Sequence, residues 1–253
     1  MTQPDQFPTA HVFCNFYDID AITGGFQGGD LIVIGSLPGI GKSTFALNIV
    51  RNASEHFPIV LFCLDTPKDQ VIIRLLSIES GIEFSKLLTE KILNSQQEPL
   101  NHACEKLAKA QIMIDDSSNL TTVDICNSVR QAKLNNKKVG MVVIDSLDLI
   151  RVSGELSNKN EEIYTIIRKL KIFAREFNIP VIVLSSVLSE VDNRLNKRPF
   201  LSDLPGRIDE IANLVFFLHR DATETSVMEV IVAKNQNGPT GVIKLFFEPQ
   251  FFR

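Results

Sequence analysis

The chain has 253 residues, 44% hydrophobic and 22% charged, a composition that excludes wholesale disorder and fibrous repeats. Twenty-six lysines and arginines against 30 acidic residues give a formal charge of −4, which excludes a uniformly basic nucleic-acid-binding coat but not a local basic channel. No apolar run approaches the ~18 residues of a membrane-spanning helix. We therefore expect no membrane association, and a location in the cytoplasm or in an organelle interior such as the plastid stroma.

Residues 1–11 are polar with two prolines and are expected to form a flexible lead-in, followed by one domain at 12–253. Strands are predicted at 30–35, 58–64, 112–114, 140–144 and 179–184. Helices are predicted at 42–51, 68–80, 84–110 with a polar break at 94–98, 122–134 and 161–177. Apolar strands that alternate with amphipathic helices indicate an α/β fold, a mostly parallel sheet with helices on both faces.

The last part of the chain has a different pattern. Strands predicted at 214–218, 227–233 and 242–247 follow one another with short polar turns, one of which reads NGPTG. This pattern indicates an antiparallel C-terminal extension on one side of the sheet.

A glycine-rich segment, GSLPGIGKST at 35–44, separates the first strand from the first helix. Strand, glycine-rich turn, Lys-Ser and helix is the arrangement of a P-loop, whose backbone N–H groups cradle phosphate oxygens. Lys42 would contact the β/γ-phosphates and the Ser43 hydroxyl would bind Mg²⁺. The first glycine of G-x-x-x-x-G-K-[ST] falls on Ser36, with Gly35 one place early, and the alternative is a chance glycine-rich turn. The predicted ATP-binding residues are Ser36, Leu37, Pro38, Gly39, Ile40, Gly41, Lys42, Ser43 and Thr44.

Two acidic residues follow predicted strands. The apolar run MVVID ends at Asp145, which in a P-loop protein would hold the water shell of Mg²⁺; taken alone, the segment favours an aspartate that caps a strand end. The strand at 58–64 is followed by Asp65, which at the carboxyl edge of a parallel sheet is the candidate general base. An Asp-Thr-Pro helix N-cap explains Asp65 equally well.

Five stretches resemble the motor domain of DnaB-type replicative helicases: FYDIDAITGGFQGGDLIVIGSLPGIGKSTFALNIV, VVIDSLDLI, LKIFAREFNIPVIVLSS, KRPFLSDL and AKNQNGPTGVIKLFFEP. They occur in the family's order and cover nearly the whole chain from residue 12. The resemblance implies a RecA-like P-loop core, assembly into a ring, expected to be a hexamer, and ATP-driven movement along single-stranded DNA. It also implies a helicase loader or a primase as a partner.

The resemblance carries over to individual residues with several departures. Lys42, Ser43 and Asp145 match. The family's catalytic glutamate falls on Asp65, whose side chain is one methylene shorter, so its carboxylate reaches about 1.5 Å less far. A displacement of that size costs roughly a hundredfold in rate. The glutamine expected to sense the γ-phosphate falls on Ser186.

The segment AKNQNGP holds the cations that the family presents to the ATP of a neighbouring subunit. Lys234 is kept, but the arginine finger position is Gln236, and such a finger is worth ~10³ to 10⁵ in rate. After KRPFLSDL, the expected DNA-facing loop is shorter than in the family and contains Gly206 and Arg207. A surface turn with a charge at a helix start explains that loop as well as a DNA contact does.

Two functions remain open at this point. One is an ATP-dependent DNA helicase motor, with ATP and Mg²⁺ as cofactors and Lys42, Asp65, Lys234 and Gln236 at the catalytic positions. The other is a hydrolysis-impaired nucleotide-binding homologue that acts as a structural or regulatory partner of a helicase ring. The segments KRPFLSDL and AKNQNGPTG argue against a recombinase-like or circadian-clock-like ATPase.

Overall fold

The computed structural model describes residues 11–135, 138–152, 158–221 and 223–253, so the expected lead-in at 1–11 lies outside it except for its last residue. The strands of the described residues are β1 (Leu31–Ser36), β2 (Ile59–Cys63), β3 (Ile112–Asp115), β4 (Met141–Asp145), β5 (Val181–Ser186), β6 (Leu214–His219), β7 (Val227–Asn235) and β8 (Gly241–Phe246). The α-helices are α1 (Tyr17–Thr23), α2 (Lys42–Ala53), α3 (Lys68–Ser80), α4 (Phe84–Leu88), α5 (Gln97–Lys109), α6 (Thr122–Leu134), α7 (Lys159–Phe177) and α8 (Ile208–Ile211).

All the predicted strands and helices occur, with ends displaced by at most two residues. The segment predicted as one interrupted helix at 84–110 is two helices, α4 and α5. A 3-10 turn, η1 (Asn94–Gln96), lies at the expected polar break.

The strands form one sheet in the order β3-β2-β4-β5-β1-β6-β7-β8. β1 lies between β5 and β6 and is parallel to both. Within the C-terminal extension β6 is antiparallel to β7, as expected, but it is parallel to its other neighbour, β1. β7 and β8 are antiparallel, as predicted. The mostly parallel sheet is confirmed.

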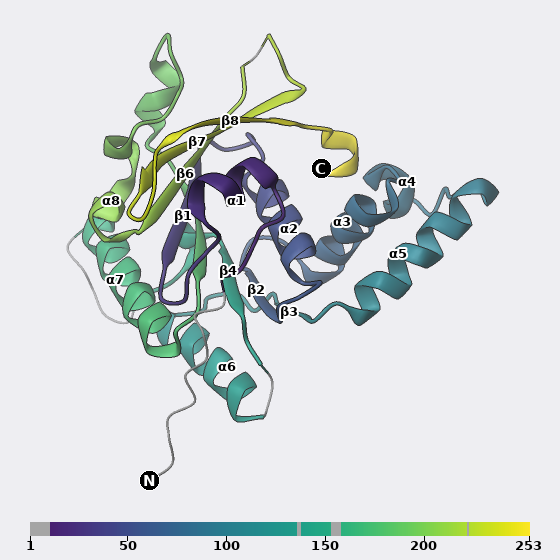
Figure 1. Cartoon of the computed structure of the whole chain (residues 1–253), viewed down its shortest axis with the longest axis horizontal. Coiled ribbons are helices and arrows are strands. Elements are labelled where there is room, and N and C mark those ends of the chain that lie inside the picture. Colours follow the sequence, from purple (N-terminus) through teal and green to yellow (C-terminus); the bar gives the residue numbers. More distant parts are fainter. Residues whose placement is uncertain (1–10, 136–137, 153–157, 222) are drawn as a thin grey trace.

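Each face of the sheet has its own hydrophobic core. Along β1, Ile32 and Ile34 pack into the core that includes α2 and α3, whereas Leu31 and Val33 pack into the core that includes α6 and α7. This alternation follows from the two-residue period of a strand, and because both faces are covered, all six residues of β1 are buried. Figure 1 shows α2, α3 and α5 on one side of the sheet and α6 and α7 on the other.

An ion-pair cluster centred on the buried side chain of Glu79 joins α2, α3 and α5. The Glu79 side chain is 6% exposed, and its carboxylate pairs with Arg51 and with Lys106. The distance from Lys106 Nζ to Glu79 Oε1 is 3.1 Å. Burial raises the pKa of Glu79, but the hydrogen bonds from the two cations outweigh burial and hold that pKa below its ordinary value. The cluster therefore stabilises the packing of these three helices with Glu79 ionised.

Within the described ranges, the structure contains no helix with the length and hydropathy needed to cross a membrane.

Candidate nucleotide-binding site

The P-loop prediction places residues 37–41 between β1 and α2, and the structure has this arrangement. Gly39 and Gly41 have φ angles of 77° and 122°, which residues with a Cβ rarely adopt. A Cβ on Gly41 would lie 3.2 Å from Cε of Met228 and 3.5 Å from the Phe247 ring. The C-terminal hairpin therefore covers the loop, and only glycine allows this approach.

The glycine displaced from the motif has a packing role. A Cβ on Gly35 would lie 2.9 Å from the Phe217 ring on β6. Ser36, at the position where the motif has glycine, is buried at the end of β1, and its hydroxyl donates to the Leu37 carbonyl at 2.7 Å. The departure from the motif thus leaves the loop intact and adds a hydroxyl beside it.

Lys42 folds back onto this loop. Its Nζ donates to the Ser36 carbonyl at 3.1 Å, to the Ser36 Oγ at 3.3 Å and to the Leu37 carbonyl at 3.4 Å. Burial lowers the pKa of Lys42, and the negative charges of Asp148 and Asp145 oppose this effect. A phosphate anion would replace these weak neutral acceptors with charged ones.

The two predicted magnesium ligands meet at the carboxyl edge of the sheet. Ser43 is the second residue of α2, Asp145 ends β4, and the two side chains are hydrogen-bonded. Burial raises the pKa of Asp145; the bond from Ser43 lowers it, and the charge of Asp65 raises it again. A hydroxyl and a carboxylate are oxygen ligands of the kind that Mg²⁺ takes, so these residues fit the ion. The described ranges hold no group of three or more His, Cys, Asp or Glu side chains that could bind a metal without the nucleotide.

Asp65 lies near this pair, as predicted for a strand end at the same edge. Its charge acts on Asp145, and the Leu64 amide donates to the Asp145 carbonyl at 2.7 Å. The alternative N-cap role is wrong, because the cap residue of α3 is Pro67 and the Lys68 amide donates to the Asp116 carboxylate at 2.8 Å. Asp65 is exposed beside the half-buried Asp145.

Two charged residues that the sequence did not single out lie at this edge. Arg74 on α3 acts on Asp145, donates to Thr66 Oγ1 at 3.5 Å, and has a buried Nε without a hydrogen-bond partner in the described residues. Asp148, in the 3-10 turn η2 (Leu147–Leu149), accepts from the Ser186 amide at 3.3 Å. Arg74 lies in none of the five family stretches. Asp148 lies in the stretch VVIDSLDLI, where the sequence singled out Asp145 alone.

Lys234 and Gln236 lie at a different edge of the sheet. The Lys234 Nζ donates to the Asp209 carbonyl at 2.6 Å, and the Gln236 Oε1 accepts from Asn213 Nδ2 at 2.6 Å. Asp209 and Asn213 precede β6, so both contacts lie at the N-terminal ends of the parallel strands β1 and β6. The P-loop follows the C-terminal end of β1. The two ends of a six-residue strand are about 17 Å apart. Their contacts therefore place both side chains away from the P-loop of their own chain.

The predicted DNA-contacting residues lie in the 3-10 turn η5 (Pro205–Arg207), which packs on the start of α7. The Gly206 amide donates to Asn160 Oδ1 at 3.2 Å, and Gly206 is buried with a φ of 61°. Arg207 is exposed, forms two hydrogen bonds of 2.7 Å to the Glu210 carboxylate and lies over the Tyr164 ring. The packing of Gly206 is explained without DNA, whereas the exposed guanidinium of Arg207 is free to reach a ligand on its outer side.

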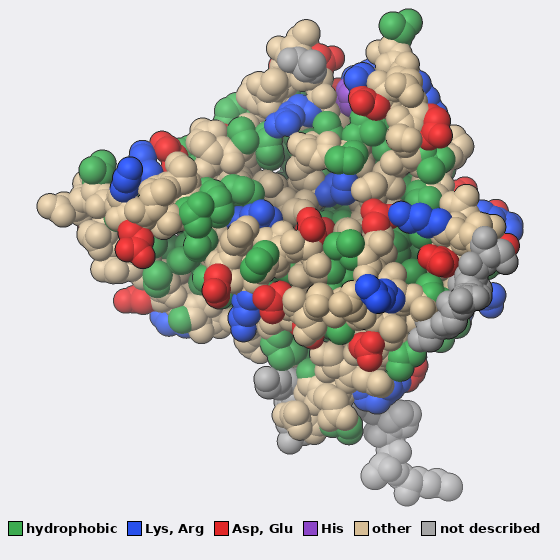
Figure 2. Space-filling model, turned by 180° about the vertical axis from the view of Figure 1, so that it is seen from behind, with side chains coloured by type: hydrophobic (Ala, Val, Ile, Leu, Met, Phe, Trp, Pro, Cys, Tyr) green, Lys and Arg blue, Asp and Glu red, His purple; other side chains and the backbone are tan. Residues whose placement is uncertain are grey.

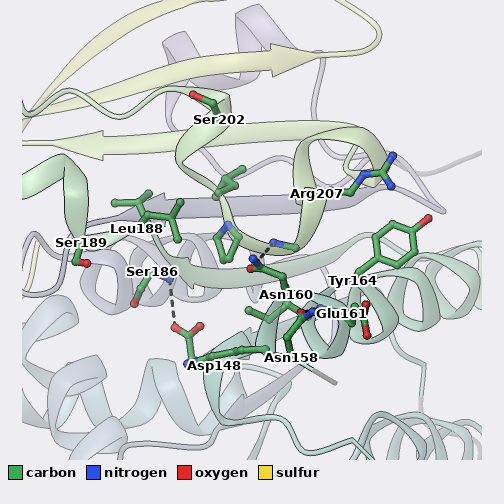
Figure 3. A pocket seen from close by; sticks show the side chains of 16 residues that line it. Asp148, Asn158, Asn160, Glu161, Tyr164, Ser186, Leu188, Ser189, Ser202 and Arg207 are labelled. Carbon is green, nitrogen blue, oxygen red and sulfur yellow. Dashed lines mark hydrogen bonds between the residues drawn. The ribbon is translucent and has the colours of Figure 1, made fainter. Parts of the chain in front are cut away.

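A groove of about 960 Å³ lies beside this turn. Its walls are the start of α7, the residues that follow β5 and the segment from Ser202 to Arg207. Figure 3 shows Asp148 and Ser186 at one end of the groove and Tyr164 and Arg207 at the other.

The surface charge is mixed. Figure 2 shows basic and acidic side chains interspersed over the face turned away in Figure 1. This distribution matches the formal charge of −4 and confines any anion-binding region to a local site.

Comparisons with known proteins identify the family. The sequence model of the DnaB-like helicase C terminal domain matches residues 12–253. A probable replicative DNA helicase of Trieres chinensis is 39% identical over 250 residues, covering 93% of this chain and 55% of that protein. The replicative DNA helicase DnaB of Geobacillus stearothermophilus is 36% identical over 247 residues, covering 93% and 54%. The chain thus spans about half the length of the curated relatives it matches.

Two solved structures share the fold. One, described as an ATPase domain, superposes with a TM-score of 0.92 at 28% identity, covering 98% of this chain and 92% of that one. A DnaB-like replicative helicase, described with its interactions with primase, gives a TM-score of 0.91 at 28% identity, covering 98% and 62%. These matches confirm the RecA-like α/β fold. The chain belongs to the DnaB-like helicase C-terminal domain family.

Proposed function

We propose that this chain is the ATP-dependent motor of a replicative DNA helicase, which binds ATP with Mg²⁺ and couples hydrolysis to movement along single-stranded DNA. The observation that carries the proposal is the meeting of the P-loop with a hydrogen-bonded Ser43–Asp145 pair at one edge of the sheet. Family membership supports it, since the relatives compared above are named as replicative DNA helicases.

In this proposal, residues Ser36 to Thr44 enclose the phosphates. The loop amides and the N-terminus of α2 attract the anion, and Lys42 exchanges its carbonyl partners for phosphate oxygens. Ser43 and Asp145 hold the magnesium side of the site. Bound Mg²⁺ would neutralise charge on the β- and γ-phosphates.

Hydrolysis requires a water molecule oriented toward the γ-phosphate. We assign this task to Asp65, an exposed carboxylate at this edge whose charge acts on Asp145. Because Lys234 lies away from its own P-loop, we assign its charge to the nucleotide of a neighbouring copy. The same holds for Gln236, whose neutral amide would replace an arginine finger worth ~10³ to 10⁵ in rate. We therefore propose a ring, with six subunits as in the family, whose turnover is slow for its class.

Single-stranded DNA is the proposed substrate of the groove beside η5. The exposed Arg207 would contact a phosphate there, and Gly206 would hold the turn against α7 so that Arg207 projects outward. A helicase loader or a primase is the proposed further partner, and one structural relative is described with a primase. We place the protein in the cytoplasm or in an organelle interior such as the plastid stroma.

A steady-state ATPase assay, with and without single-stranded DNA, tests the proposed function. The motor predicts Mg²⁺-dependent turnover that DNA stimulates, and Lys42→Ala should abolish nucleotide binding and turnover together. Mass measurement with ATP and Mg²⁺ tests the ring in the same samples. Tight nucleotide binding without turnover, with or without DNA, would contradict the motor and favour a hydrolysis-impaired regulatory homologue.

A further inference from the structure

The exposed side chain of Gln236 is held in place by its own chain. Gln236 directly follows β7, and it contacts Asn213, the residue before β6. The Gln236 backbone amide donates to the Asn213 carbonyl at 3.0 Å, and Asn213 Nδ2 donates to Gln236 Oε1 at 2.6 Å. Because backbone and side chain are bound to the same residue, the orientation of the Gln236 carboxamide depends on that of the Asn213 carboxamide.

The orientation of the Asn213 carboxamide follows from two partners that can only donate. Its Oδ1 accepts from the Leu31 amide at 3.0 Å and from Lys171 Nζ at 2.6 Å. A backbone N–H cannot accept a hydrogen bond, and a lysine ammonium has three donors and no acceptor. The oxygen of Asn213 therefore faces β1 and α7, and its NH₂ group faces Gln236.

The residues around this pair are anchored as well. Lys171 is half-buried on α7, and its Nζ also donates to the Gly29 carbonyl at 2.7 Å. Asn235, the last residue of β7, donates from Nδ2 to the Ile22 and Pro239 carbonyls, each at 3.0 Å. The end of β7 is thus fixed on both sides before any ligand or neighbouring copy arrives.

The outward atoms of Gln236 are therefore donors. Its Oε1 is occupied by Asn213, so the Nε2 group, with two N–H bonds, is directed away from Asn213 and has no hydrogen-bond partner among the residues that the structure describes. A neutral amide lacks the charge of an arginine. A donor that is already aimed where negative charge develops still stabilises a transition state, because it needs no reorganisation.

We propose that Gln236 is a catalytic hydrogen-bond donor to the nucleotide of a neighbouring copy, and that Asn213 is the positioning residue that turns its Nε2 group outward. The inference rests on the proposed ring and on the proposed ATPase, because Gln236 lies away from its own P-loop. Lys171 acts on this donor only through Asn213. One such donor is worth about 10² to 10³ in kcat, less than the ~10³ to 10⁵ of an arginine finger, so turnover is slow but not absent.

Exchange of side-chain amide protons, measured by NMR on the nucleotide-free chain, tests the orientation without relying on activity. One Nδ2 proton of Asn213 should exchange about two- to tenfold more slowly than either Nε2 proton of Gln236, as expected for one hydrogen bond. Asn213→Asp keeps the acceptor for Leu31 and Lys171 but has no donor. In this variant the Gln236 carboxamide should turn over, and one of its Nε2 protons should become protected instead. Protection of a Gln236 Nε2 proton already in the wild type would overturn the proposal.

Steady-state ATP turnover of the assembled chain with single-stranded DNA tests the donor itself. Asn213→Asp should lower kcat by about 10²- to 10³-fold, while the affinity of the intact P-loop for a fluorescent ADP stays within about threefold of wild type. Gln236→Leu should lower kcat equally. The double variant should lower it no further, because Asn213 acts only through the Gln236 amide. Asn127→Asp on α6, whose Oδ1 likewise accepts from a cation, Arg130 at 2.9 Å, is the matched control and should keep the wild-type kcat.

Losses that multiply in the double variant would show that Asn213 acts through the fold in general, and would overturn the proposal. A Gln236→Leu chain with wild-type turnover would do the same. A wild-type chain that binds ADP but does not hydrolyse ATP when assembled would defeat the proposed function itself. The exchange measurement would then still decide the orientation of Gln236, so the two failures remain distinguishable.

Discussion

Replacing Gly206 with alanine should destabilise the chain by about 2–5 kcal/mol. The left-handed backbone at this position, with φ at 61°, costs a residue with a Cβ about 1–2 kcal/mol. The new Cβ would also lie 2.5 Å from Cγ2 of Ile163 and 2.9 Å from the Asn160 carbonyl oxygen. Overpacking of this kind costs about 1–3 kcal/mol, and a backbone oxygen cannot move aside cheaply.

Gly24 provides a matched control for this variant. Its φ is 71°, and a Cβ there would meet nothing within 4 Å. Gly24→Ala should therefore lose only the backbone cost of about 1–2 kcal/mol. The difference in free energy of unfolding between the two variants therefore measures the contribution of packing between η5 and α7.

Equilibrium unfolding in urea, followed by far-UV circular dichroism because the chain has no tryptophan, measures both variants. We expect Gly206→Ala to fall below Gly24→Ala by about 1–3 kcal/mol in free energy of unfolding. Equal losses in the two variants would refute the packing explanation. If Gly206→Ala then also lost affinity for single-stranded DNA, the glycine would be needed for close approach of the nucleic acid instead.

Two further predictions concern single sites, and a third concerns a pair of positions. Glu79→Gln should lower the free energy of unfolding, measured in urea, by about 1–3 kcal/mol. Because Arg51 and Lys106 hold the pKa of Glu79 below its ordinary value, the stabilisation by the ionised carboxylate is fully present above about pH 4.3. It is lost as the pH falls below that value. Arg207→Gln should reduce the salt dependence of single-stranded DNA binding by about 0.7 in slope while changing stability by less than about 1 kcal/mol, and an unchanged slope in a fluorescence anisotropy titration would contradict a phosphate contact. The double change Asp65→Glu with Gln236→Arg should raise ATP turnover, and a steady-state rate no higher than wild type would contradict our account of these positions.

The sequence predicted the elements and the phosphate loop because both depend on local patterns. Alternation of apolar strands with amphipathic helices placed the predicted strands and helices within two residues, but it did not predict the short helices α1 and α8. The position of Asp145 beside Ser43 followed from the strand-end rule for parallel sheets.

The parts that could not be predicted depend on long-range packing. β6 starts the antiparallel hairpin that the sequence indicates, but its parallel pairing with β1 depends on the long connection from β5, which has no strand of its own. Gly35 looked like a displaced phosphate-loop glycine, but the Phe217 ring against it explains why it is needed. Asp148 lies in the stretch VVIDSLDLI, but only the folded chain brings it to the Ser186 amide.

Calorimetric titration of ATP into the wild-type chain and into Lys42→Ala, each with and without Mg²⁺, tests the central claim most directly. The account predicts saturable binding by the wild type that Mg²⁺ strengthens, and none by Lys42→Ala at the same concentrations. Equal binding by the two proteins, or a wild-type chain indifferent to ATP, would contradict a nucleotide site at this loop.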